Sequence, residues 1–339
     1  MARAGVLVLV AALGGAVVLG SSGAGTAPAQ PAPDRSTWRW YKGNTHAHTL
    51  KSDGDSTPDE VTRWYKEHGY QFLVLSDHNV LTPIAELARL HGEPERFLLV
   101  AGEEVTDAFD GKPLHVNGVN VTGLVEPRHG ASVVDTLQRN TDAIREAGGV
   151  PHVNHPNFGW AISPDDLQAL QRYQLLEIFN GHPAVNNLGG GDRPGMEAVW
   201  DRLLTAGRRV YGIAVDDAHY FKRPWDPRAP KPGQGWVVVR APRLDAAALM
   251  ASLEAGEFYA STGIEFDAYT ADTAAIAVRV RPLGDTRFRS ALIGPGGAVL
   301  ATADGPTARF PLAGRTGYAR LVVTDSNGAT AWGQPVFLR

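Results

Sequence analysis

The chain of 339 residues has a formal net charge of −4 and contains no cysteine. This mild charge balance favours neither a nucleic-acid partner nor a membrane surface. The absence of cysteine excludes disulfide bonds, thiolate metal ligands and a cysteine nucleophile. The length suits one large α/β domain with a smaller second domain.

The first residues have the pattern of a secretory signal peptide. Arg3 precedes an apolar run over residues 5–19, and the small residues that follow end in Ala-Pro-Ala at 27–29. This order predicts a signal peptide over residues 1–29, followed by a linker over 30–37. We therefore expect an exported protein, periplasmic or secreted, with no stable membrane insertion after cleavage. An uncleaved anchor is the alternative, although the run is short for a bilayer.

Strand-like and helix-like segments alternate from Trp38 to Tyr220. The first helix is expected to begin at a capping box, Thr57-Pro58-Asp59-Glu60, with proline at the first helical position. A second capped start, at Ser163, predicts a short helix. The other expected helices cover residues 133–147 and 196–206, and the expected strands cover 71–75, 97–101, a segment ending at 155, 175–179 and 210–215.

The pattern changes in the last third of the chain. Residues 221–235 are rich in proline and charge and predict a surface excursion. A strand over 236–239, a helix over 244–255 and a connector over 257–263 are expected next. Short alternating runs from about Glu265 onward predict a small antiparallel β-sandwich over residues 264–339.

Histidines and carboxylates recur where the expected strands end. Neutral imidazole and carboxylate are the ligands that first-row divalent metals bind in proteins. In α/β barrels the carboxyl ends of the strands meet at one mouth, so side chains far apart in sequence converge there. The candidates are His46, His48, Asp53, Asp77, His78, Glu103 or Glu104, His115, His155, Asp217 and His219.

Each motif alone has an ordinary explanation. His46 and His48 face the same side of a strand, as alternate residues always do. Asp53 can stabilise its own turn, and His152 competes with His155 as a ligand. The joint order of the motifs is what indicates a cluster of two or three ions that activates water for hydrolysis.

The order HxH, SDG, DH, GxE, H, HP and DxH resembles the PHP (polymerase and histidinol phosphatase) superfamily over roughly residues 38–219. The segments WDRLLTAGRRVYGIAVDDAHY, EAGEFYASTG and TDSNGATAWGQPVF are similar to its exported CehA/McbA-like branch, which is named after carbaryl hydrolysis. The resemblance implies an α/β fold, a distorted seven-stranded (βα) barrel over residues 38–263, with the β-sandwich after it.

The resemblance also implies how the ligands divide among zinc, manganese or iron ions. Glu104 fits the family pattern of glycine, any residue and glutamate better than Glu103 does. The first ion is expected to take His46, His48, Glu104 and Asp217, the second Glu104, His115 and His155, and the third Asp53, His78 and His219.

Several further polar residues lie beside these motifs. Asp77 and Asp216 are predicted catalytic residues that orient ligand histidines through their second ring nitrogen, with acid or base chemistry also open for Asp216. Glu177 is expected to pack or to hydrogen-bond inside the barrel mouth rather than to bind metal. The candidate substrate contacts are Asn154, Asn180, His182 and Arg193.

These observations favour a metal-dependent hydrolase that acts on a small-molecule ester. The first expectation is a phosphoesterase that uses a metal-bridging hydroxide on phosphomonoesters or phosphodiesters. A carboxylester or carbamate hydrolase is second, because Phe158, Trp160 and Trp225 can line an apolar pocket. A non-catalytic, metal-stabilised binding protein is third. Nucleic acid is not an expected partner, and the oligomeric state is open.

Overall fold

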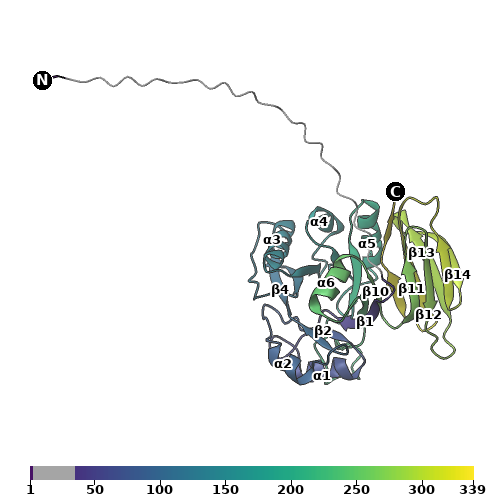
Figure 1. Cartoon of the computed structure of the whole chain (residues 1–339), viewed down its shortest axis with the longest axis horizontal. Coiled ribbons are helices and arrows are strands. Elements are labelled where there is room, and N and C mark those ends of the chain that lie inside the picture. Colours follow the sequence, from purple (N-terminus) through teal and green to yellow (C-terminus); the bar gives the residue numbers. More distant parts are fainter. Residues whose placement is uncertain (3–34) are drawn as a thin grey trace. The chain divides into compact units, whose positions relative to one another are not determined.

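The computed structural model describes residues 1–2 and 35–339 (Figure 1). The predicted signal peptide, apart from its first two residues, and most of the predicted linker lie outside the described residues. Residues 37–339 form one compact unit with a mixed α/β fold, as predicted. No helix in the described part of the chain is long and apolar enough to cross a bilayer.

The helices are short and begin at local signals in the sequence. The capping box predicted at Thr57 forms, and the helix start predicted at Ser163 also has one, with each hydroxyl accepting the backbone N–H three residues later. The α-helices are α1 (Pro58–Glu67), α2 (Ala85–His91), α3 (Val133–Glu146), α4 (Pro164–Ala169), α5 (Met196–Thr205) and α6 (Ala246–Glu254), and a 3₁₀ turn, η1, covers Pro295–Gly297.

Two sheets carry the ends of the strands at which the candidate ligands lie. In the first sheet, β1 pairs in parallel with β2 and β2 with β3. The second sheet has the order β4-β5-β6-β7-β8. Their strands are β1 (Arg39–Asn44), β2 (Phe72–Val74), β3 (Leu98–Val100), β4 (Gly102–Phe109), β5 (Lys112–Val119), β6 (Val150–Val153), β7 (Leu175–Asn180) and β8 (Tyr211–Val215).

Both edge strands of the second sheet meet the ends of strands β1 and β2 of the first sheet. A parallel bridge joins Ala47, after β1, to Ala218, after β8, and a second joins His78, after β2, to Glu104 of β4. The backbone N–H of His48 donates to the carbonyl of Ala218 at 2.9 Å. The strand ends of both sheets are therefore held side by side, and their side chains share one region.

An antiparallel hairpin also supplies candidate ligands, whereas the (βα) barrel expected from the sequence has parallel strands. Strands β4 and β5 pair antiparallel over their full length, and β5 pairs antiparallel with β6. The hairpin turns at Asp110 and Gly111, which both have positive φ. An Asp-Gly pair between two apolar runs favours this two-residue turn, so the sequence held a signal for it.

The first sheet continues past the domain boundary predicted at Gly263. Strand β10 pairs antiparallel with β9 on one side and with β17 on the other. All four residues of β10 are buried, so the connector predicted over 257–263 is wrong. The strands involved are β9 (Trp236–Ala241), β10 (Phe258–Ser261), β13 (Phe288–Gly294), β14 (Ala298–Asp304), β16 (Gly317–Asp325), β17 (Thr330–Gly333) and β18 (Val336–Leu338).

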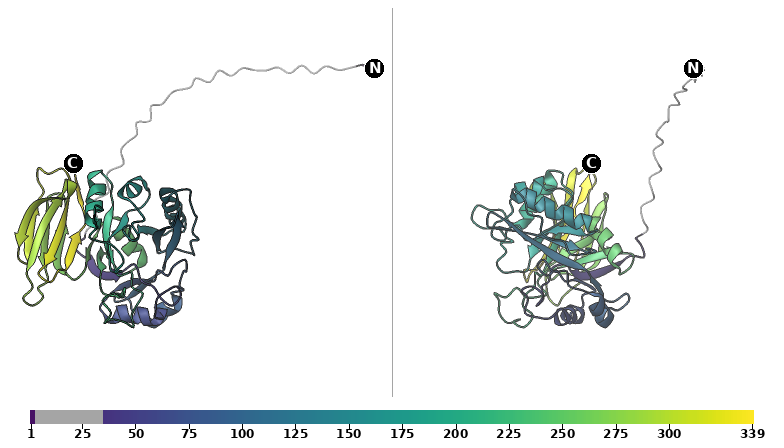
Figure 2. Two further views of the ribbon diagram at one scale, coloured as in Figure 1. Left: turned by 180° about the vertical axis from the view of Figure 1, so that it is seen from behind. Right: turned by 90° about the vertical axis from the view of Figure 1, so that its left-hand side faces the viewer.

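A third, smaller sheet packs onto this extension. It has the order β11-β12-β15, formed by Phe266–Ala271, Ala275–Val280 and Thr307–Pro311. Ile276 and Phe310 from this sheet share one hydrophobic core with Leu292 and Leu321 of the first sheet. Figures 1 and 2 show these strands, in green to yellow, as a layer beside the helical part of the chain.

A buried ion pair joins strand β16, in the extension of the first sheet, to helix α5. Arg320 on β16 is 1% exposed, and its Nε and Nη2 donate to the two carboxylate oxygens of Asp201 at 2.7 Å each. The hydroxyl of Tyr318 donates to the same carboxylate at 2.8 Å. Because α5 leads directly into β8, the pair fixes the element that precedes Asp217.

Arg320→Ala is expected to lower the free energy of unfolding by about 3–5 kcal/mol, because it leaves the Asp201 carboxylate buried without its partner. The double variant Arg320→Met with Asp201→Leu is expected to recover much of that loss. Denaturant unfolding measures both. Arg289→Ala, which breaks only an exposed pair with Asp304, is the control and is expected to change little. Equal stability of Arg320→Ala and wild type would contradict the role of the pair.

Candidate metal centre

A small cavity opens where the strand ends of the two sheets meet. Its volume is about 130 Å³. All but two of its lining residues were predicted as metal ligands from the sequence, and the two exceptions are Phe158 and His182. The lining residues are Asp53, His78, Glu104, His115, His155, Phe158, His182, Asp217 and His219.

Glu104 lies at the centre of the cluster and is fully buried. Burial alone would raise the pKa of this carboxyl, but the charges of the surrounding histidines hold it well below its usual value. Its Oε2 lies 3.3 Å from Nε2 of His46, 3.3 Å from Nε2 of His48 and 3.0 Å from Nδ1 of His78, and its Oε1 lies 2.9 Å from Nδ1 of His115 and 3.3 Å from Nε2 of His155.

Three overlapping groups of side chains have the spacing of metal ligands. Within each group, one ligand atom per residue lies within 4.8 Å of the others. All nine predicted ligands except His155 belong to a group, and His155 contacts Glu104 directly. The groups are His46, His48 and Asp217; His78, Glu104 and His115; and His48, Asp53, His78 and His219.

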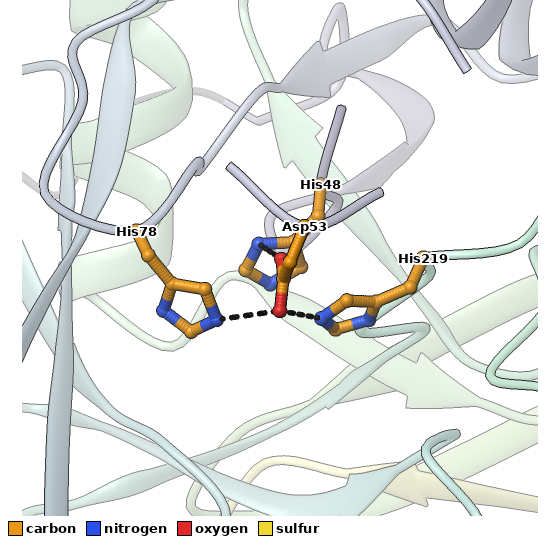
Figure 3. Close-up of side chains that lie close together, drawn as sticks. All are labelled: His48, Asp53, His78 and His219. Atoms are coloured by element: carbon orange, nitrogen blue, oxygen red, sulfur yellow. Dashed lines mark ion pairs between the residues drawn. The ribbon is translucent and has the colours of Figure 1, made fainter. Parts of the chain in front are cut away.

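The last of these groups lies on the exposed side of the cluster. Oδ2 of Asp53 lies 3.5 Å from Nε2 of His78 and 3.4 Å from Nε2 of His219 (Figure 3). The other oxygen of Asp53 lies 3.6 Å from Nδ1 of His48. The Asp53 side chain is 53% exposed, whereas that of His48 is fully buried. An ion held by this group would therefore be more accessible to solvent than one held by His46, His48 and Asp217.

Polar atoms at the centre of the cluster fit a bound cation. Nε2 of His46, Oε2 of Glu104 and Nδ1 of His115 are buried and have no hydrogen-bond partner within the described residues. Leaving such atoms unpaired is costly. Nε2 of His46 lies 3.3 Å from Oε2 of Glu104, and Nδ1 of His115 lies 2.9 Å from the other oxygen of the same carboxylate. Divalent cations would satisfy all three atoms, and a donor set of imidazole and carboxylate suits zinc, manganese and iron.

Glu177 lies outside the cavity lining and orients His46 and the backbone at His155 by hydrogen bonds. Its Oε1 accepts from Nδ1 of His46 at 2.7 Å, so that Nε2 of this ring presents its lone pair to the cluster. Its Oε2 accepts the backbone N–H of His155 and the side-chain amide of Asn180, at 2.7 and 2.9 Å. Glu177 therefore hydrogen-bonds inside the mouth, as expected from the sequence.

Two other ligand rings are held through Nδ1. The hydroxyl of Thr106 donates to the carbonyl of Glu104 and lies 2.6 Å from Nδ1 of His78, so it accepts from that ring. Nδ1 of His219 donates to the carbonyl of Asp217 at 2.9 Å. Both rings thus direct Nε2 toward Asp53 (Figure 3).

The expected role of Asp77 and Asp216 in orienting histidines is wrong. Asp77 accepts hydrogen bonds from Thr49, Ser52 and Thr82 and thereby holds the loop after β1. Asp216 accepts from the hydroxyl of Tyr65 and the backbone N–H groups of residues 234 and 235. Burial raises the pKa of Asp216 to about 6. Neither residue lines the cavity within the described part of the chain.

The predicted substrate contacts have different surroundings. Asn154 donates to Oε1 of Glu104 at 2.7 Å, and Asn180 donates to Oδ2 of Asp217 at 3.1 Å. Both are buried and hold ligand carboxylates instead of lining the cavity. The guanidinium of Arg193 stacks on the ring of Trp160 at 4.9 Å, outside the lining residues. Of the four, His182 alone lines the cavity.

Two of the predicted ligands have a backbone conformation that is uncommon for residues with a side chain. The φ angle is 22° at His155 and 49° at Asp217. Hydrogen bonds hold both: the N–H of His155 donates to Glu177, and the N–H of Asp217 donates to the carbonyl of His46 at 3.0 Å. Such conformations persist where the surrounding structure enforces them, commonly at functional sites.

The chain shares a distant sequence relationship with a nuclease. It is 24% identical over 187 residues to a 5'-3' exoribonuclease of Haemophilus influenzae, which covers 51% of this chain and 67% of that protein. No family model matches the chain.

The chain also resembles two solved structures. A two-domain protein of Bacteroides vulgatus, described as containing a predicted PHP-like metal-dependent phosphoesterase, is 14% identical with a TM-score of 0.50, covering 89% of this chain and 95% of that chain. A metal-dependent phosphoesterase of Bifidobacterium adolescentis is also 14% identical, with a TM-score of 0.41, covering 54% of this chain and 89% of that chain. The first likeness shows a PHP-like mixed α/β fold.

Glu177→Gln is expected to lower the metal affinity about 10- to 100-fold, because an outer carboxylate fixes the ring that binds the ion. Elemental analysis after dialysis against a graded chelator measures the change. Glu103→Gln is the matched control. Glu103 is also buried, its pKa is raised to about 7 by burial, and its Oε1 accepts the N–H of Val125 instead of contacting a histidine. Equal metal retention by the two variants would contradict the role of Glu177.

Asp53→Ala is expected to remove one ion and leave the others bound, because Asp53 contacts only the exposed group of ligands. His78→Ala is expected to do the same. Ion counting per chain by elemental analysis distinguishes this result from general loss of metal. Full metal content in both variants would show that the exposed group does not hold an ion.

Proposed function

We propose that the protein is a metal-dependent hydrolase of ester bonds, and most specifically a phosphoesterase. The observation that carries the proposal is the convergence of six histidines and three carboxylates from both sheets around one cavity. Three central ligand atoms are buried and lack a hydrogen-bond partner within the described residues. The PHP-like fold supports the same activity, since the matched two-domain protein is described as containing a predicted PHP-like metal-dependent phosphoesterase.

The proposed ligand sets are those predicted from the sequence, with Glu104 shared between the two buried sets. Ions bound there would supply activation of water and stabilisation of negative charge on the ester oxygen atoms. Glu177 keeps Nε2 of His46 available to an ion. Asn154 and Asn180 fix the Glu104 and Asp217 carboxylates by donating to them. The two amides thus hold negative charge in place close to the reacting group.

The proposal extends to the architecture and the cellular location. We take the strands around the cavity as the distorted seven-stranded barrel and the layer after residue 263 as a β-sandwich that packs on it. Export through the signal peptide, and membership of the CehA/McbA-like branch, belong to the same proposal. The sequence patterns at residues 1–29 and in the last third of the chain support them.

A carboxylester or carbamate hydrolase is the second candidate. The half-buried ring of Phe158 in the cavity wall favours it, because this ring offers an apolar surface to an uncharged ester. The predicted absence of a nucleic-acid partner stays a prediction, and the exoribonuclease relationship makes RNA a necessary substrate in any assay.

Chelation, or His46→Ala, is expected to abolish turnover of the preferred substrate, because both changes remove the buried ion next to Glu104. Assays on p-nitrophenyl phosphate, its diester, p-nitrophenyl acetate and a 5'-phosphorylated RNA oligonucleotide measure it. His68→Ala is the control, since His68 stacks on Trp64 outside the cavity lining. Turnover that survives both chelation and His46→Ala would refute a metal-dependent hydrolase. Turnover of the acetate alone would favour the second candidate.

A further inference from the structure

A closed belt of six aromatic rings surrounds the cavity. Each ring lies beside the next, with centroid distances between 5.1 and 6.2 Å. Four of the rings are predicted metal ligands, and the two others are neighbours in the belt. In order the rings are His78, His115, His155, Phe158, His182 and His219.

The two remaining members of the belt, Phe158 and His182, come from loops that are fastened to each other. An isolated antiparallel bridge joins Phe158 to Val185. The side-chain amide of Asn157 donates to the carbonyl of Asn186 at 2.9 Å, and the amide of Asn186 donates back to the carbonyl of Asn157 at 3.2 Å. The two loops that carry Phe158 and His182 are thus held together by backbone and side-chain hydrogen bonds and do not lie independently of each other.

The hydrogen bonds of His182 fix which ring nitrogen carries its proton. Nδ1 accepts the backbone N–H of Ala184 at 3.1 Å. The N–H of His182 itself donates to the side-chain oxygen of Asn180 at 2.8 Å, which fixes the backbone. With Nδ1 accepting, the proton of the neutral ring is on Nε2, the nitrogen farther from the backbone. His182 therefore offers a hydrogen-bond donor where all other polar lining residues are potential metal ligands.

The size of the cavity limits what the belt can surround. At about 130 Å³ it is well below the roughly 300 Å³ at which pockets begin to enclose a whole small ligand. Only the reacting group of a substrate fits inside. The rest of a bound substrate would extend out of the cavity over Phe158 and His182, which form the one side of the belt without a predicted metal ligand.

We propose that this cavity takes a terminal phosphoryl group, with Nε2–H of His182 donating to a phosphoryl oxygen and Phe158 packing against the esterified alcohol. The inference rests on the proposed phosphoesterase function and names its substrate class as phosphomonoesters. A phosphate group presents only acceptors, which suits a fixed donor. An internal phosphodiester carries two organic groups, and the belt leaves one exit for them.

The metal-loaded full chain tests the substrate class with p-nitrophenyl phosphate and bis(p-nitrophenyl) phosphate. We expect kcat/KM to be at least about 10-fold higher for the monoester, in line with the loss of one well-placed contact. A higher kcat/KM for the diester would overturn the inference and leave the proposed phosphoesterase function intact. Turnover of neither phosphate ester would overturn both.

His182→Phe and His182→Gln test the donor. His182→Phe keeps a ring in the belt without the N–H and is expected to lower kcat/KM on the monoester about 10- to 100-fold, the worth of a hydrogen bond to a charged group. Competitive inhibition by inorganic phosphate is expected to weaken by a similar factor. His182→Gln restores an amide donor near the position of Nε2 and is expected to recover most of this loss.

His68→Phe is the matched control, because His68 also stacks on an aromatic ring but lies outside the cavity lining. Elemental analysis of each variant separates loss of the donor from loss of metal. If His182→Phe keeps its metal and retains wild-type kcat/KM and phosphate inhibition, His182 is not the donor. If His182→Gln is as impaired as His182→Phe with metal intact, the ring has a role other than donating.

Discussion

The negative charge of Glu104 is the constraint on which the rest of the site depends. A carboxylate with no solvent exposure is expensive unless its surroundings compensate it. Here five imidazoles surround it within 3.3 Å, and a buried amide from Asn154 donates to it. Without this charge the histidines would offer only neutral nitrogen atoms to a cation, and the charge without the histidines would destabilise the fold. The histidines compensate the buried charge, and together these groups could hold divalent ions.

The hairpin of β4 and β5 explains how one carboxylate meets so many rings. Glu104 pairs with Asn117, and Thr106 pairs with His115, across the antiparallel ladder. Side chains two residues apart on a strand, and those directly opposite, share one face of the sheet. One face of the hairpin thus carries the central carboxylate, a ligand ring and the hydroxyl that holds His78. The bridges at the two edges of the second sheet bring the candidate ligands that follow β1, β2 and β8 close to this face.

The sequence predicts the identities of the clustered residues better than their orientations. The candidate ligands could be predicted because side chains at the carboxyl ends of the strands of an α/β barrel lie close together. Asp77 is an example of a residue whose orientation the sequence does not predict. A carboxylate that follows a strand gives the same sequence pattern whether its side chain points to the cavity or to a neighbouring loop. Its partners Thr49 and Thr82 lie in loops whose course only the fold determines. Strand β10 was missed for a related reason, because four buried residues between turns lack any clear periodicity.

The orientation of each ring supports one division of the ligands among ions. An imidazole normally binds an ion through one nitrogen while the other is held by a hydrogen bond. His46 is held at Nδ1 by Glu177, so its Nε2 is left for the buried set that contains Asp217.

His78 and His219 are held at Nδ1 by the Thr106 hydroxyl and by the Asp217 carbonyl, which leaves both Nε2 atoms for Asp53. His115 and His155 then remain for the second oxygen of Glu104, to which both are closest. The hydrogen bonds that hold His46, His78 and His219 thus agree with the division into three sets that the family resemblance implies. The protein forms these hydrogen bonds by itself, without an ion.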